Sequence, residues 1–154
     1  MVVIKVKRDT DAGLNYLKNA CLYLENDEKS LFTGGCGIDP DKAYEHMLKV
    51  RKYFGKTSGN PLIHFIVSFD ETVVTVDTAI LLAERLTNFY CNQYQILWCV
   101  HFKQRGCSNF HVHFIINSVS FINGMMFHSS ASEISRFANY AEIVLNRKVK
   151  WFFE

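Results

Sequence analysis

Two histidines separated by one residue, His111 and His113, are the residues of this sequence best placed to do chemistry. They lie in a run of aromatic and β-branched residues, which favours a β-strand over a helix. Because successive side chains of a strand point to opposite faces, both histidines point to the same face. An imidazole buried without a partner is costly, so these rings require partners. A metal ion would supply them, and so would a network of hydrogen bonds.

A third histidine, His101, lies near the end of the preceding apolar segment, and a polar connection containing glycine joins the two segments. If they form an antiparallel hairpin with His101 opposite His111 or His113, all three rings share one face, with β-carbons about 4.5 to 5.5 Å apart. A slip of one residue would turn His101 to the other face. Three converging imidazoles would hold Mg²⁺ or Mn²⁺ loosely, or Zn²⁺, Co²⁺ or Ni²⁺ more tightly, with positions left for substrate and water.

The other histidines have less distinctive settings. His64 lies in an apolar strand-like run and could contact a ligand histidine or the substrate, or be an ordinary core histidine. His46 lies in a charged helical stretch and is expected to be solvated. His128 lies near an expected loop, from which it could reach a ligand.

Composition limits the class of protein. A chain of 154 residues, 49% hydrophobic and with 2 prolines, suits one domain over residues 1–154 and argues against disorder. The net charge of +2 requires any nucleic-acid contact to be a local basic patch. The 5 cysteines lack CxxC spacing, which favours reduced thiols. No apolar run approaches the roughly 20 residues that span a bilayer, so a cytoplasmic protein is expected.

The pattern of apolar residues predicts an α+β fold with a central, mostly antiparallel sheet flanked by helices and the histidine pair on a central strand. N-cap chemistry for the first helix is expected from Asp9, Thr10 and Asp11. The expected strands cover residues 2–7, 62–69, 94–102 and 110–121, and 149–153 is a terminal strand or a hydrophobic tail. The expected helices cover 12–25, Asp39 to near Gly55, 75–90 and 133–145, and 31–37 is a loop or short irregular strand.

Three blocks of the sequence resemble the relaxase/mobilisation nuclease family of plasmids and conjugative elements, which carries an HUH motif. They are LNYLKNACLYLENDEKS at 14–30, LIHFIVSFDE at 62–71 followed by AILLAERL at 79–86, and VHFKQRGCSNFHVHFIINSVSFINGMMF at 100–127. The third block contains all three histidines, the trailing Asn117 and Gly124. The blocks occur in the family's order.

This resemblance implies an endonuclease that nicks one DNA strand at a transfer origin, stays joined to the 5′ phosphate through tyrosine and can rejoin the strand. It implies that His101, His111 and His113 bind a divalent metal and that Tyr23 is the nucleophile. Tyr16 lies two helical turns earlier on nearly the same face, so it is an alternative nucleophile. Both tyrosines could instead only pack at the edge of the core.

The resemblance also implies residues around the metal and along the DNA. His64, Glu71 and Asn117 would contact the metal ligands or the substrate. Lys103 and Arg105 follow His101 closely and are expected to contact phosphates. Further basic candidates are Lys52, with Lys49, Arg51 and Lys56 in KVRKYFGK, and the patch of Arg147, Lys148 and Lys150, although a solvated helix face explains KVRKYFGK somewhat better.

The expected partners are single-stranded DNA at a transfer origin and accessory mobilisation proteins. A rolling-circle replication initiator or a transposase of the same class is an alternative, and so is a relaxase-like module that binds DNA without cutting it. Lys103 favours the last, because family members usually carry an acidic residue there. A cupin-like oxygenase also uses a His-x-His strand, but this chain lacks the glycine-rich, all-β pattern of that class. The chain ends soon after the nuclease region, so a minimal relaxase domain or a piece of a longer protein is expected.

Overall fold

One six-stranded sheet organises the protein, with strand order β2-β4-β5-β3-β1-β6. The computed structural model describes residues 1–7, 13–26, 28–102 and 109–154. The strands are β1 Val2–Lys7, β2 Ser30–Cys36, β3 Leu62–Ser68, β4 Ile96–Phe102, β5 Phe110–Asn117 and β6 Val149–Phe153, and the helices are α1 Leu14–Asn26, α2 Ala43–Tyr53, α3 Val76–Thr87 and α4 Ala131–Leu145, with a short 3-10 helix at Pro40–Lys42. Every strand pair is antiparallel except β1 with β6, so the expected α+β fold is confirmed.

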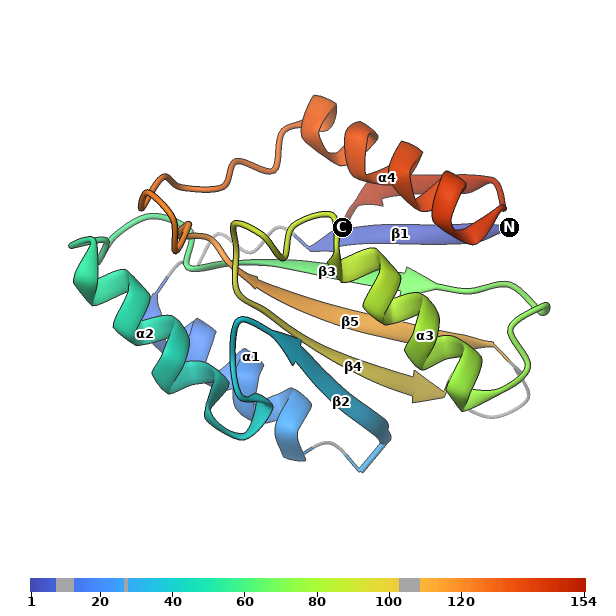
Figure 1. The fold of residues 1–154 in the computed structure, drawn as a ribbon, viewed down its shortest axis with the longest axis horizontal. Coiled ribbons are helices and arrows are strands. Elements are labelled where there is room, and N and C mark those ends of the chain that lie inside the picture. The colour runs from blue at the N-terminus through green and yellow to red at the C-terminus, as the bar shows by residue number, and fades with distance from the viewer. Residues whose placement is uncertain (8–12, 27, 103–108) are drawn as a thin grey trace.

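Helices α3 and α4 cover one face of the sheet and bury the main core there. Alternate residues of the strands point into this core, as Ile4, Phe65 and Val112 do, and Phe137 of α4 stacks on Phe65 with ring centroids 5.2 Å apart. In Figure 1, α4 lies along the side of the sheet that β1 and β6 form. Burial of alternate side chains of β1 explains the alternation of apolar and charged residues from which this strand was predicted.

The opposite face carries a smaller core beneath α1 and α2. Leu17, Cys21 and Leu24 repeat at helical spacing on α1 and pack with Leu97 and Ile115 of the sheet. Within the described residues, β1 and β6 contribute nothing to this second core. Figure 1 shows α1 and α2 near the β2 side of the sheet, away from β6. The described helices therefore cover only part of the sheet face that bears the second core.

Two segments are defined more closely than the sequence allowed. Residues 30–36 form a strand with an irregular register between Ser30 and Phe32, which is the short irregular strand expected as the alternative to a loop. Gly34 lets this strand approach Trp98 closely, because a Cβ there would collide with the indole. The predicted strand over 110–121 ends at Asn117, since the following residues turn. The predicted N-cap at residues 9–11 lies outside the described residues.

The expectation that all cysteines are reduced is wrong for one pair. Cys36 and Cys91 form a disulfide with their Cα atoms 5.9 Å apart, whereas Cys21 and Cys99 are buried thiols. The two bonded cysteines are 55 residues apart in sequence. They meet because the end of β2 lies beside the connection from α3 to β4, which cysteine spacing does not indicate. None of the described helices is both long and apolar enough to cross a membrane.

Candidate active site

The hairpin register brings the three histidines together on the partly covered face. His101 of β4 pairs directly with His111 of β5, and Cys99 pairs with His113. β5 lies inside the sheet between β4 and β3. Because paired residues of neighbouring strands share a face, the third ring joins the other two, as the sequence predicted for this register.

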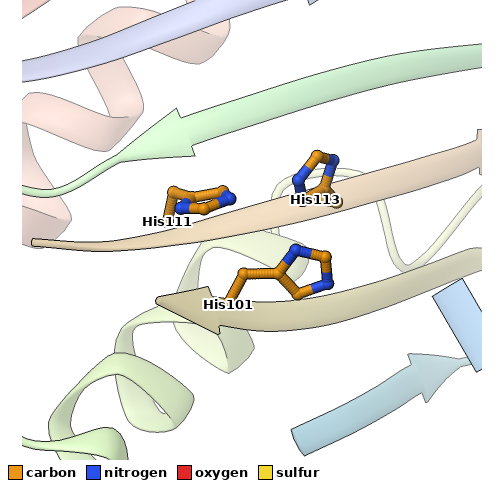
Figure 2. A group of neighbouring side chains, drawn as sticks. All are labelled: His101, His111 and His113. Atoms are coloured by element: carbon orange, nitrogen blue, oxygen red, sulfur yellow. The ribbon is translucent and has the colours of Figure 1, made fainter. Parts of the chain in front are cut away.

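The three rings are close enough to bind one ion. Each histidine offers a ring nitrogen, and these nitrogens lie within 4.8 Å of one another. The ring centroids are 5.3 Å apart for His101 and His111, 4.6 Å for His101 and His113, and 5.1 Å for His111 and His113. Figure 2 shows the rings gathered over the neighbouring strands β4 and β5. The donor set is all imidazole, which suits borderline divalent metals.

His64 of β3 makes a direct contact with this cluster. Its Nε2 lies 2.9 Å from Nδ1 of His113, and both rings are buried. Burial lowers the pKa of His64 to about 3 and that of His113 to about 2, where the neighbouring histidines add to the effect. Both rings are therefore neutral near pH 7, which is the form that binds metals. With Nδ1 engaged by His64, His113 presents Nε2 to a ligand.

Helix α1 places two tyrosines against the histidines. A cavity of about 460 Å³ opens between α1 and the sheet. Tyr16 and Tyr23 line it from the helix because residues seven apart share a face, and His64 and His113 line it from the sheet. Tyr16 is partly buried against the second core, whereas Tyr23 is 56% exposed.

A second cavity, of about 420 Å³, opens on the other side of the histidines. Val3, Lys5, Ile66, Ser68, His111 and His113 line it. His113 also lines the tyrosine cavity, so the two cavities adjoin at this residue. A strand bound over the histidines would therefore meet α1 on one side and β1 on the other.

A family model named relaxase, MobA/VirD2-like, nuclease domain, matches residues 16–147. The chain belongs to this relaxase family. The match covers both tyrosines and all three clustered histidines, whereas β1 and β6 lie outside it. Membership makes the chain a relaxase nuclease domain that nicks DNA and binds single strands. A comparison with curated proteins found no match.

The structure does not bring every predicted residue of this relaxase to the histidines. Lys103 and Arg105 lie outside the described residues. Glu71 is exposed in the turn after β3, and Lys52 is exposed on α2 and lines neither cavity. Asn117 is fully buried four residues beyond His113, roughly 13 Å along β5.

Asn117 has structural partners at its end of the strand. Its amide donates to the backbone oxygen of Met47, 3.2 Å away, and to Oε1 of Gln95, 3.0 Å away. These contacts join α2 and the start of β4 to the end of β5. In the relaxase, Asn117 therefore fixes the packing of α2 and does not touch the histidine cluster.

Among the expected basic residues of the relaxase, Arg51 differs from expectation, whereas Arg147 and Lys148 form surface ion pairs. Arg51 is 1% exposed and donates to the oxygen of Pro61 at 3.3 Å and to Oγ of Ser118 at 3.0 Å, so it is a core residue and not a phosphate contact. Arg147 lies 3.6 Å from Asp70, and Lys148 lies 3.8 Å from Glu142. Exposed His128 lines a separate cavity beside Tyr90 and Glu133.

The residues that sequence reasoning missed come from the two terminal strands. Lys5 lines one cavity, and Lys7 and Glu154 line the other. Their proximity to the histidines depends on β1 pairing with β3 and on β6 pairing in parallel with β1. The alternation in residues 2–7 predicted one solvent-exposed face of the strand. No local signal indicates that this face lies on the same side of the sheet as the histidines.

Proposed function

We propose that this relaxase domain acts in the cytoplasm on one strand of the transfer origin of a plasmid or conjugative element, with accessory mobilisation proteins as partners. Tyr23 is the proposed nucleophile, and His101, His111 and His113 are the proposed metal ligands. The observation that carries the proposal is the cavity in which tyrosines of α1 face His64 and His113. Tyrosine, which can act as a nucleophile, and histidine, which can bind a metal, line the same cavity, and this supports the proposal.

The histidine cluster fits a divalent metal by its chemistry. Its nitrogens lie within 4.8 Å of one another, and His113 is neutral. Imidazole ligands suit Mn²⁺, Zn²⁺, Co²⁺ or Ni²⁺ better than Mg²⁺, which prefers oxygen donors. A bound ion would polarise the scissile phosphate and stabilise its extra negative charge during attack. His64 holds the ring of His113 in one orientation through the 2.9 Å contact.

Tyr23 is favoured over Tyr16 by its accessibility and by the family resemblance. Its side chain is more than half exposed, whereas Tyr16 packs partly against the second core. The Tyr23 oxygen forms a bond to phosphorus while the bond from phosphorus to the 3′ oxygen breaks. The phenolic proton leaves the tyrosine, and the released 3′ oxygen takes up a proton. Because one phosphate ester replaces another, a 3′ hydroxyl can reverse the reaction and rejoin the strand.

Lys103 and Arg105 are proposed phosphate contacts because they follow His101 in the sequence. An ammonium or guanidinium group there would pair with the charge of the bound strand. Glu71 is proposed to act near the same end of the sheet, since Ser68 pairs with His111 and Glu71 follows three residues later.

The experiment is covalent-adduct formation on a denaturing gel. Wild-type protein is incubated with labelled single strands from the transfer origin and Mn²⁺, and a shifted protein–DNA band is expected. Tyr23→Phe abolishes the band, whereas Tyr16→Phe retains it. Tyr53→Phe is the matched control, because Tyr53 is 82% exposed on α2 and lines neither cavity.

Calorimetry tests the proposed metal ligands separately from nicking. His111→Ala and His113→Ala should remove Mn²⁺ binding in calorimetry as well as the adduct. A Tyr23→Phe protein that still forms the adduct would contradict the nucleophile assignment. Full Mn²⁺ binding in both histidine variants would contradict the ligand assignment, whatever their nicking activity.

A further inference from the structure

A strip of the sheet face that none of the described helices covers adjoins the histidine cluster. Seven residues of β1, β3 and β6 form it, and all of them point to the histidine face: Val3, Lys5, Lys7, Ile66, Ser68, Lys150 and Phe152. The register fixes these neighbours, since Lys5 pairs with Ile66 on one side and with Phe152 on the other. We call these seven residues the terminal-strand strip.

The strip combines positive charge with an aromatic ring. Lys150 is exposed, and Phe152 is 44% exposed although it is a large apolar side chain. The Nζ of Lys5 lies 5.7 Å from the centroid of the Phe152 ring. A nucleotide carries an unpaired base and a charged phosphate on one unit, so this pair offers a partner to each.

The strip is continuous with the active site. The cavity that Lys5, Ile66 and Ser68 line is also lined by His111 and His113. Lys7 extends the positive charge toward the tyrosine cavity, which it lines with Glu154. Glu154 is the one carboxylate among the described residues that line these two cavities. A strand whose phosphate lies at the histidines would thus have a charged path along β1.

We infer that the terminal-strand strip binds the single strand beside the cleavage point, with one base stacked on Phe152 and phosphates paired with Lys5, Lys7 and Lys150. This inference rests on the proposed function, which places the scissile phosphate at the histidines. The residues that β1 and β6 contribute to the strip lie outside the residues that the family model matches, whereas Ile66 and Ser68 of β3 lie inside them. Glu154 restrains Lys5 through a half-exposed pair of 3.6 Å, which a phosphate can replace.

The test is the affinity for a fluorescein-labelled oligothymidylate of about 20 nucleotides, measured by anisotropy over a range of salt concentrations. Phe152→Ala weakens binding about tenfold, as expected for the loss of one stacked base. Phe152→Tyr restores most of the affinity because it keeps the ring. The combined Lys5→Ala and Lys150→Ala variant reduces the slope of log affinity against log salt by about 1.4, since each charge contributes about 0.7 on a single strand.

Matched variants distinguish a specific effect of the strip on DNA affinity from a general effect of positive charge and from misfolding. Lys42→Ala removes an exposed lysine at the other end of the sheet, next to α2, and should leave the affinity unchanged within twofold, that is, about 0.4 kcal/mol. Glu154→Gln should strengthen binding, because it removes the charge that competes for Lys5. Phe152→Ala should not alter binding to the corresponding duplex, whose bases are already stacked. Unchanged circular dichroism of each variant establishes that it folds.

Failure of this inference is distinguishable from failure of the proposed function. If wild-type protein forms the tyrosine adduct but Phe152→Ala and the double lysine variant bind oligothymidylate like wild type, the strip does not bind DNA and the inference is overturned. If the strip variants weaken binding as expected but wild-type protein forms no adduct, DNA binding by the strip is supported and the nicking proposal fails. An equal loss of affinity for duplex and single strand in Phe152→Ala would overturn the stacking role.

Discussion

Replacement of His64 by leucine tests how strongly the neighbouring strand supports the metal ligands. His64→Leu replaces the imidazole with an apolar side chain of similar size. It therefore removes the 2.9 Å contact with Nδ1 of His113. Both rings are buried, so the lost hydrogen bond leaves His113 less restrained and costs about 1 to 3 kcal/mol. That range corresponds to a roughly 5- to 150-fold loss of metal affinity, which includes the usual 10- to 100-fold effect of removing a group that orients a ligand histidine.

Calorimetric titration with Mn²⁺ and with Co²⁺ measures this loss directly. His128→Leu is the matched control, because His128 is exposed and lines a different cavity. His64→Gln should recover part of the affinity, since its amide can still hydrogen-bond Nδ1 of His113. If His64→Leu binds both ions within twofold of wild type while His111→Ala binds neither, the orienting role of His64 is refuted.

Three further predictions concern stability. Arg51→Met should lower the free energy of unfolding in urea by about 1 to 3 kcal/mol, because Pro61 and Ser118 lose a buried donor; an effect below about 0.5 kcal/mol would contradict this role. The hydrogen bonds from Thr72 and the N-terminal ammonium group hold the pKa of Asp70 below its ordinary value of 3.8, so Asp70 stabilises the fold at pH values above that ordinary value. This contribution is lost as pH falls through the lowered pKa, so the melting temperatures of wild type and Asp70→Asn should converge in acid, and a constant difference would count against the prediction. Gly34→Ala should destabilise by about 1 to 3 kcal/mol and shift Trp98 fluorescence, because the added methyl group meets the indole; unchanged melting and emission would show that the indole moves aside without cost.

The histidine cluster could be predicted because it depends on short-range rules. Strand alternation put His111 and His113 on one face, and a single hairpin register decided the position of His101. Apolar spacing predicted the helix that carries Tyr23, and Pro40 after Asp39 predicted the start of the helix that carries Arg51. The sequence did not indicate what those helices pack against. The burial of Arg51 was therefore not predicted.

The remaining differences come from contacts between distant segments. Asn117 belongs to the most specific sequence block, yet its partners are Met47 and Gln95, which sequence spacing does not connect to it. Cys36 and Cys91 likewise meet through tertiary packing. The parallel pairing of β6 with β1 joins the two ends of the chain, so the lysines and Phe152 of the terminal-strand strip could be placed only after folding was known.

The position of Glu154 decides how the protein should be tagged for these experiments. This residue lines the cavity that holds Tyr16 and Tyr23, so a tag fused after it would begin at the mouth of that cavity. Met1 lies at the other end of β1, where its ammonium group is 3.4 Å from Asp70. A tag before Met1 would disturb an ion pair near the surface but would leave the path to the tyrosines open.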